Sequence, residues 1–143
     1  MKYRILFFVI LFIGACFTVN AQAKTSDEEA DAIIHLLGVQ KKQAVAQLVA
    51  MADKDTATFW KIYAEYQNAN KLTAKNRLHL YEATAHAYAN LTPTVADSLA
   101  QQFFVNRSGQ EKMAEEYYQK IKKAINPVVA FEFYQAETWL LTQ

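Results

Sequence analysis

The side chains best suited to chemistry in this sequence are two histidines and a glutamate in its central part. Glu82 and His86 follow His79 by three and seven positions, and this spacing places all three on one face of a helix. Imidazole nitrogens and carboxylate oxygens are ligands of zinc, and imidazole also suits copper. The pattern predicts either a zinc or copper site or a solvated helix face that includes histidines. We favour the solvated face, because ligand spacing alone often occurs by chance.

No other group of residues has the pattern of a catalytic centre. The sequence contains one cysteine, Cys16, and three glycines, so it offers no thiol pair and no glycine-rich phosphate-binding loop. No serine, histidine and aspartate occur together in a recognisable motif. We therefore expect a protein that is not an enzyme and that holds no cofactor other than the metal ion just considered.

The N-terminal segment has the layout of a targeting signal. Lys2 and Arg4 precede an uncharged apolar run, and the small-residue site "AQA" follows it at 21–23. Basic, apolar and small-residue regions in this order are typical of a cleaved secretory signal peptide. We expect residues 1–23 to be this signal peptide and residues 24–143 to form a single helical domain in the periplasm.

Two alternatives to a soluble exported chain remain open. The apolar run could be retained as a membrane anchor, although it falls short of the roughly 20 residues that a spanning helix needs. The segment "IGAC", ending at Cys16, resembles a bacterial lipobox, in which that cysteine would carry a lipid. The stretch after Cys16 is apolar where a lipoprotein usually turns polar, which favours the soluble form over the lipoprotein.

The exported portion is the size of one small domain. Removing residues 1–23 from the 143-residue chain leaves 120 residues and no cysteine, so stability must come from packing or oligomerisation rather than from disulfides. Without Lys2 and Arg4, the 15 basic residues fall to 13 against 14 acidic ones, a net charge of −1. This balance gives no reason to expect nucleic acid as a partner.

Helices are the only regular structure that the exported sequence predicts. Glycine and proline are rare, and no stretch alternates polar and apolar residues as a strand does. Thr92 before Pro93 and Asn126 before Pro127 are typical helix starts, since the first residue caps the helix and proline fits its first position. The fold class is therefore all-α, with helices expected at about 27–51, divided at Gly38, and at about 56–90, 92–125 and 127–141.

The two central helices dominate this architecture. Each has roughly 33 to 35 residues and is about 50 Å long at 1.5 Å per residue. The turn between them, near Leu91, is so short that they must form an antiparallel hairpin in which residue i faces roughly residue 182 − i. We expect the shorter N- and C-terminal helices to pack at the open end of the hairpin, opposite Leu91.

Six polar residues interrupt the apolar faces of the hairpin at one level. Three come from each helix, and an unpaired charge among them would cost stability. They form either a hydrogen-bonded layer that fixes the register of the two helices, which we favour, or a region open to water. This predicted polar layer consists of Asn70, Thr73, Arg77, Asn106, Arg107 and Gln110.

Aromatic side chains around the hairpin turn and at the edge of its apolar face are predicted to form a partner surface. The terminal helices attach far from the turn, so residues near it should stay uncovered. The last helix is apolar almost all round, which is more than one contact can bury. We therefore expect a homodimer of packed hairpins. The predicted partner surface consists of Trp60, Tyr81, Tyr88, Phe103 and Phe104.

An exported, cysteine-free helical hairpin with "LTP" at a helix start resembles the bacterial periplasmic stress proteins of the Spy and CpxP type. Their LTxxQ motifs open helices, as "LTPTV" at 91–95 and "INPVV" at 125–129 do here, with Val95 in place of the glutamine. The resemblance implies a curved helical dimer that binds partly unfolded or envelope proteins as clients on a concave surface, or that reports envelope stress to a sensor. Relatives of this group include zinc resistance-associated proteins.

Several longer segments are similar to a group of uncharacterised periplasmic proteins. They are "FWKIYAEY" at 59–66, Arg77, "YEATAHAYANLT" at 81–92 and "FYQAE" at 133–137, and they span nearly all of the exported chain. This similarity implies no established activity. We thus expect a non-enzymatic periplasmic protein that acts as an ATP-independent chaperone or envelope-stress adaptor. Periplasmic metal binding or metal sensing is the alternative.

Overall fold

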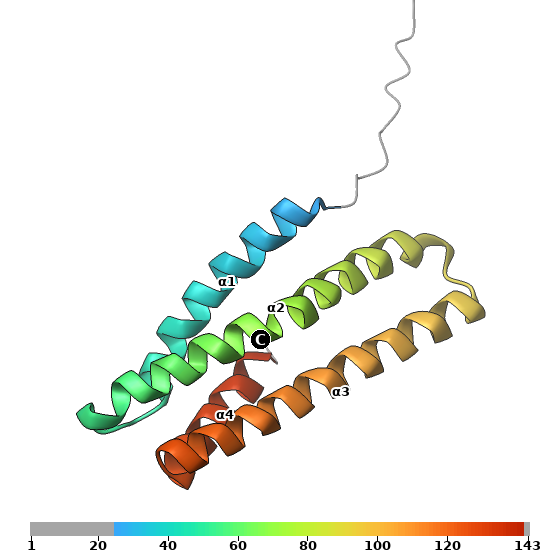
Figure 1. Ribbon diagram of the computed structural model, residues 1–143. Helices are drawn as coiled ribbons and strands as arrows, with labels where there is room; N and C mark the ends of the chain where they lie inside the picture. The colour runs from blue at the N-terminus through green and yellow to red at the C-terminus, as the bar shows by residue number, and fades with distance from the viewer. Residues whose placement is uncertain (1–24, 142–143) are drawn as a thin grey trace, which may run out of the picture.

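The computed structural model describes residues 25–141, which form four α-helices packed against one another (Figure 1). No strand occurs in this range, which confirms the all-α class. The predicted signal peptide and Cys16 lie outside the described residues, and no helix within them is long and apolar enough to cross a membrane. The elements are α1 (Asp27–Leu48), α2 (Asp53–Ala87), the 3-10 helix η1 (Tyr88–Asn90), α3 (Pro93–Ala124) and α4 (Pro127–Leu141).

The helix starts follow from side chains that cap free backbone N–H groups. Thr92 accepts a hydrogen bond from the N–H of Val95 at 3.3 Å. Asn126 accepts from the N–H groups of Val128 and Val129 at 2.8 and 3.0 Å. Both caps precede a proline, as the sequence predicts. The start of α1 adds a reciprocal capping box between Ser26 and Glu29.

Two expectations about the first half of the chain are wrong in detail. Gly38 does not divide the first helix; α1 continues through it and ends at Leu48 rather than near Met51. The carbonyl of Gly38 instead accepts a hydrogen bond from Gln67 Nε2 at 3.0 Å, so the glycine lies at a contact between two helices. The helix α2 starts at Asp53, earlier than predicted, and it has no side-chain cap.

The helices α2 and α3 pack side by side and run antiparallel (Figure 1). The ring centroids of Tyr66 and Tyr117 lie 5.3 Å apart, and those of Tyr81 and Phe103 lie 5.5 Å apart. Both pairs agree closely with the predicted register. The two helices are joined by η1 and the residues before Pro93. This end of the hairpin, together with the adjoining parts of α2 and α3, is called the tip below.

The helices α1 and α4 pack against the hairpin away from its tip (Figure 1). The first helix runs antiparallel to α2, and the last helix folds back along α3, where the Tyr134 hydroxyl donates to Glu111 at 3.3 Å. Glu132 of α4 accepts the N–H of Ala50 at 2.8 Å, just after the end of α1. The open end is therefore a four-helix bundle, whereas the tip is built mainly from α2, η1 and α3.

The hydrophobic core lies within the four-helix part. Its largest side chains are aromatic and come from three helices, so the bundle is held by ring packing as much as by aliphatic contacts. The buried residues of this core are Val45, Val49, Phe59, Tyr63, Tyr66, Tyr117, Ile121, Val129, Ala130, Phe133 and Ala136.

Replacing either helical glycine by alanine is expected to stabilise the protein. Neither Gly38 nor Gly109 has a positive φ. A Cβ at Gly38 would lie 3.9 Å from the Gln67 side chain, an ordinary contact, and one at Gly109 would meet nothing within 4 Å. We expect Gly38→Ala and Gly109→Ala each to raise the unfolding free energy by about 0.5–1 kcal/mol, measured by urea denaturation.

The matched control is Ala69→Gly, at an exposed position inside α2. It should lower the unfolding free energy by a similar amount, because glycine loses more backbone entropy in a helix than alanine. Destabilisation by Gly38→Ala would show that α1 and α2 approach too closely there to admit a methyl group.

Candidate functional site

The predicted partner residues fall into two separate places. Tyr81, Tyr88 and Phe104 are 59%, 77% and 64% exposed at or near the tip. Phe103 is half-buried beneath Tyr81. Trp60 lies at the other end of α2, partly buried against the core, with its ring 5.1 Å from that of Phe59. The structure therefore joins four of the five residues near the tip and leaves Trp60 with the core.

Other apolar residues extend the exposed area around these aromatics. The start of α1, where Asp27 lies 3.8 Å from His79, and Thr138 near the end of α4 reach the edge of this region, but several apolar side chains there stay exposed. We call the resulting area the tip surface. It consists of Tyr81, Tyr88, Leu91, Val95, Phe104 and Val105.

The tip also has a groove on each of two sides. The larger, of about 710 Å³, has Leu80, Ala83 and Val105 among its lining residues, together with the amides of Asn76, Gln101, Gln102 and Asn106. The smaller, of about 260 Å³, we call the arginine groove. The residues used below that line it are Arg77, Tyr81, Phe103, Phe104, Arg107, Gln110 and Glu111.

The predicted polar layer lies where the four-helix part gives way to the tip. Asn106 Nδ2 donates a hydrogen bond to the backbone carbonyl of Thr73 at 2.9 Å, so one member of the layer links α3 to α2. Asn70 and Gln110 are buried, and Asn70 Oδ1 and Gln110 Nε2 have no hydrogen-bond partner among the described residues. The layer is thus only partly hydrogen-bonded within the protein.

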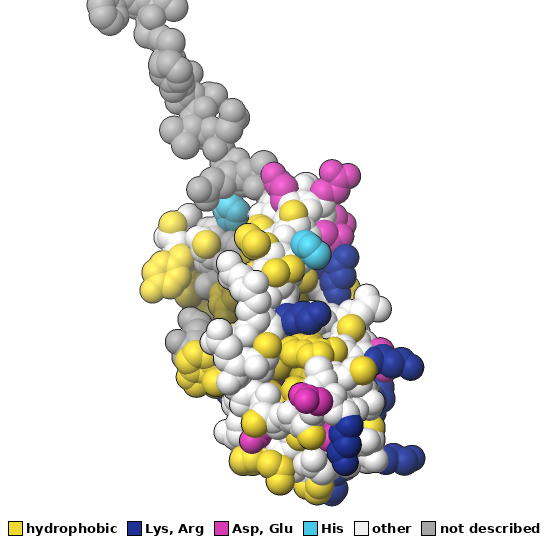
Figure 2. All heavy atoms as spheres, turned by 90° about the vertical axis from the view of Figure 1, so that its left-hand side faces the viewer, with side chains coloured by type: hydrophobic (Ala, Val, Ile, Leu, Met, Phe, Trp, Pro, Cys, Tyr) yellow, Lys and Arg dark blue, Asp and Glu magenta, His cyan; other side chains and the backbone are white. Residues whose placement is uncertain are grey.

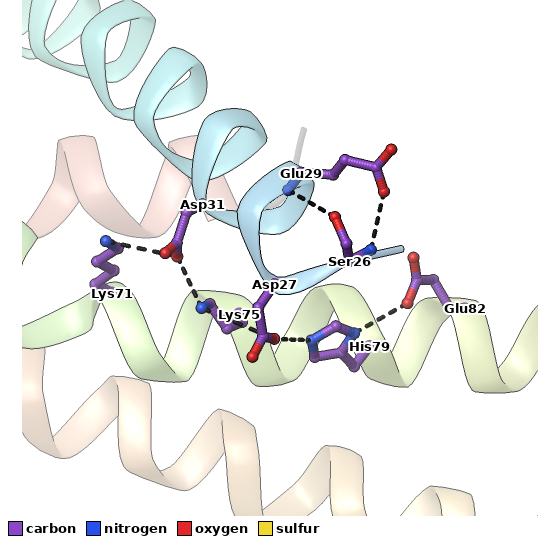
Figure 3. A network of polar contacts seen from close by, with 8 residues as sticks. All are labelled: Ser26, Asp27, Glu29, Asp31, Lys71, Lys75, His79 and Glu82. Carbon is purple, nitrogen blue, oxygen red and sulfur yellow. Dashed lines mark hydrogen bonds and ion pairs between the residues drawn. The ribbon is translucent and has the colours of Figure 1, made fainter. Parts of the chain in front are cut away.

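Two of the three predicted metal ligands, His79 and Glu82, belong to a network that fastens the start of α1 to α2 (Figure 3). His79 Nδ1 lies 3.0 Å from Glu82 Oε2, and its Nε2 lies 3.8 Å from Asp27 of α1. His86 is exposed and lines the larger groove with His79 and Glu82. Within residues 25–141, no three His, Cys, Asp or Glu side chains are placed to hold a metal ion. A zinc or copper site therefore stays a prediction.

Hydrogen bonds and charges in this network lower the pKa of two carboxyl groups, those of Glu82 and Asp31. The side chain of Thr25, followed by that of His79, lowers the pKa of Glu82 by hydrogen bonding to its charged form. Lys75 lies 2.8 Å from Asp31 and lowers the pKa of that carboxyl in the same way. Both effects keep these acids ionised, so the network acts as a set of ion pairs between two helices.

The least expected feature of the structure is a buried carboxylate, Glu137 of α4, which is fully inaccessible to solvent. Its oxygens accept hydrogen bonds from the hydroxyls of Tyr66 at 2.7 Å and Tyr63 at 3.2 Å, both on α2. Lys41 of α1 forms an ion pair with it. A buried charge is tolerated only when it is paired and hydrogen-bonded. The carboxylate of Glu137 therefore connects α1, α2 and α4.

Burial within this cluster affects its tyrosines. Removal from water raises the pKa of the Tyr63 and Tyr66 hydroxyls, and the negative charge of Glu137 raises both further. The two side chains therefore act as hydrogen-bond donors up to strongly alkaline pH. Their role in the fold is to satisfy the carboxylate.

Sequence reasoning missed Glu137, although "FYQAE" contains it. One signal was present: Ala130, Phe133 and Glu137 are spaced by three and four positions, so the glutamate continues the buried stripe of α4. A charged residue on such a stripe requires a partner from another helix. The identity of that partner depends on the docking of α1, which the sequence pattern did not specify.

Comparisons with known proteins give no assignment for the chain. No family model matches it, and neither the curated proteins nor the solved structures include a match. The functional argument therefore rests on the residues and surfaces described above.

Replacing the buried carboxylate by an amide should strongly destabilise the protein. Glu137→Gln keeps the volume of the side chain, but it leaves the Lys41 ammonium unpaired and turns an N–H donor toward the tyrosine hydroxyls. We expect the unfolding free energy to fall by about 3 kcal/mol or more. The exposed Glu115→Gln on α3 is the control and should change it by less than about 0.5 kcal/mol.

A double variant separates the pairing from other effects. In Lys41→Met/Glu137→Gln, no buried charge remains unpaired, so the loss should be smaller than the sum of the two single losses. Simple additivity of the two losses in urea denaturation would contradict the pairing.

Alkaline pH should destabilise the protein through the same cluster. Because the folded state raises the pKa of Tyr63 and Tyr66, above about pH 10 the unfolded chain loses protons that the folded chain keeps. The unfolding free energy must then fall with rising pH, by up to about 1.4 kcal/mol per pH unit for each tyrosine. Denaturation between pH 8 and about 11.5 would measure the slope.

Two phenylalanine variants assign this slope. Tyr66→Phe removes one of the two buried hydroxyls and should make the decline above about pH 10 shallower. Tyr88→Phe removes a hydroxyl that is 77% exposed and should leave the decline unchanged. Equal slopes in both variants would show that the buried tyrosines do not set the alkaline limit.

Proposed function

We propose that this is an exported, periplasmic, non-enzymatic protein that binds partly unfolded proteins, as an ATP-independent chaperone or an envelope-stress adaptor. The observation that carries the proposal is the exposed tip surface, where Tyr88, Phe104 and Val105 are 64–77% exposed. Large exposed apolar side chains gathered in one part of a molecule are typical of sites that bind other proteins. The hydrophobic core lies in the four-helix part, away from the tip. The tip can therefore bind a client without unfolding the bundle.

The larger groove suits an extended peptide chain. Its lining includes Leu80, Ala83 and Val105, which can pack against apolar client side chains. The amides of Asn76, Gln101 and Gln102 lie around it and can exchange hydrogen bonds with a client backbone. Contacts of these two kinds are independent of client sequence, so the groove supports binding of many unfolded segments rather than of one folded partner.

Exposed apolar residues away from the tip support the predicted homodimer. Leu36 and Leu37 of α1 are 59% and 55% exposed, and Val128 and Phe131 of α4 are 65% and 56% exposed. The face shown in Figure 2 carries several separate hydrophobic patches of this kind. Pairing of two copies through them would cover apolar surface while leaving both tips accessible.

Suppression of client aggregation would test the proposal. We expect an equimolar amount of the protein to reduce light scattering of a thermally unfolding client, without ATP, because binding competes with client association. Tyr88→Ser/Phe104→Ser should lose most of this effect. Leu48→Ser is the control: its side chain is 46% exposed at the end of α1, away from the tip and outside the residues named for the homodimer, and the variant should retain the effect.

Two results would contradict the proposal in different ways. If the unaltered protein has no effect on several unrelated clients, the chaperone function is wrong. If the tip double variant and Leu48→Ser are equally impaired while both remain folded by circular dichroism, clients bind outside the tip.

A further inference from the structure

The arginine groove has a composition that differs from the rest of the tip. It lies between α2 and α3 and is closed on one side by Thr138 near the end of α4. Its volume of about 260 Å³ is just below the range of roughly 300–1,000 Å³ that is usual for drug-sized ligands. A molecule that fills it must therefore be small.

Two guanidinium groups give this groove a positive charge. Neither Arg77 nor Arg107 forms an ion pair with any side chain of residues 25–141. One acid, Glu111, also lines the groove and accepts the Tyr134 hydroxyl at 3.3 Å. Two positive groups against one negative group leave a net positive site. Arg77 is half-buried, so an anion that pairs with it gains more than it would at a fully exposed arginine.

A buried amide supplies a second, independent observation. Gln110 is 7% exposed and lines the groove. Its Nε2 atom is buried without a hydrogen-bond acceptor in the described part of the chain. A buried donor without an acceptor destabilises a protein. An oxygen-rich group in the groove, reached by a rotation of the amide, would provide the missing acceptor.

The walls of the groove select for an apolar body next to that oxygen-rich group. The rings of Tyr81 and Phe103 lie 5.5 Å apart, and Phe104 adds a side chain that is 64% exposed. Aromatic faces pack well against flat apolar groups and against the guanidinium plane of arginine. A bare inorganic anion would leave these walls uncovered.

We propose that the arginine groove binds a small organic acid. Its carboxylate or phosphate is held by Arg77, Arg107 and Gln110, and its apolar body packs on the aromatic walls. The site is distinct from the larger groove, and it shares Tyr81 and Phe104 with the tip surface. Its three polar residues come from the predicted polar layer, so that layer serves a ligand rather than the helix register alone.

Calorimetric titration of the purified protein with defined probes would test this proposal. We expect 3-phenylpropionate or phenyl phosphate to bind saturably at one site per chain, and the stronger of the two identifies the acidic group. The uncharged 3-phenylpropionamide and the ring-free acetate should each bind at least about tenfold more weakly, because each lacks one of the two recognised parts.

Variants assign the binding to the groove. Arg77→Gln and Arg107→Gln should each weaken binding of the preferred probe by about tenfold or more. Lys123→Gln, which changes an exposed side chain elsewhere on α3, should not weaken it. Arg107 is exposed, so its variant stays informative even if Arg77→Gln fails to fold. The proposal is overturned if neither acid binds saturably, if acetate binds as well as 3-phenylpropionate, or if Arg107→Gln binds the preferred probe normally.

Discussion

The contact on which the rest of the structure depends is the buried carboxylate of Glu137. It accepts hydroxyls from two tyrosines of α2 and pairs with a lysine of α1, so three helices meet at one charged group. Apolar packing alone tolerates small shifts between helices, whereas a buried charge is stable only when all its partners are in place. Phe133, one turn earlier on α4, packs edge-on against both tyrosine rings and holds them toward the carboxylate.

This anchoring explains why the molecule is uneven along its length. The cluster fixes α1 and α4 on the hairpin at its open end, and α4 is only 15 residues long, so Thr138 near its end is its one residue that lines the arginine groove. Helices of about 32 and 35 residues must then continue alone. Two helices cannot bury a broad apolar face, so Tyr88, Phe104 and Val105 remain exposed. The packed core and these exposed apolar side chains thus lie in different parts of one hairpin.

Local signals predicted the helices well, and long-range contacts were the part that sequence could not supply. The Thr92-Pro93 and Asn126-Pro127 starts depend on neighbouring residues alone, so they were readable. Gly38 was wrongly predicted to divide the first helix. It lies instead at a contact between α1 and α2, where its carbonyl accepts a hydrogen bond from Gln67, 29 positions away. The partners of Glu137 are 71 and 74 positions away on α2. No periodicity within α4 could identify them.

The polar layer shows how a structural cost can indicate a site. A fully apolar layer of similar volume would make the hairpin more stable, since Asn70 and Gln110 each keep a buried atom without a partner among residues 25–141. One hydrogen bond, from Asn106 to Thr73, already links the helices at this level, so register does not require all six residues. The unpaired arginines face the same groove as Gln110. A ligand that pairs with all three would offset the cost of these unpaired groups, which register alone leaves unexplained.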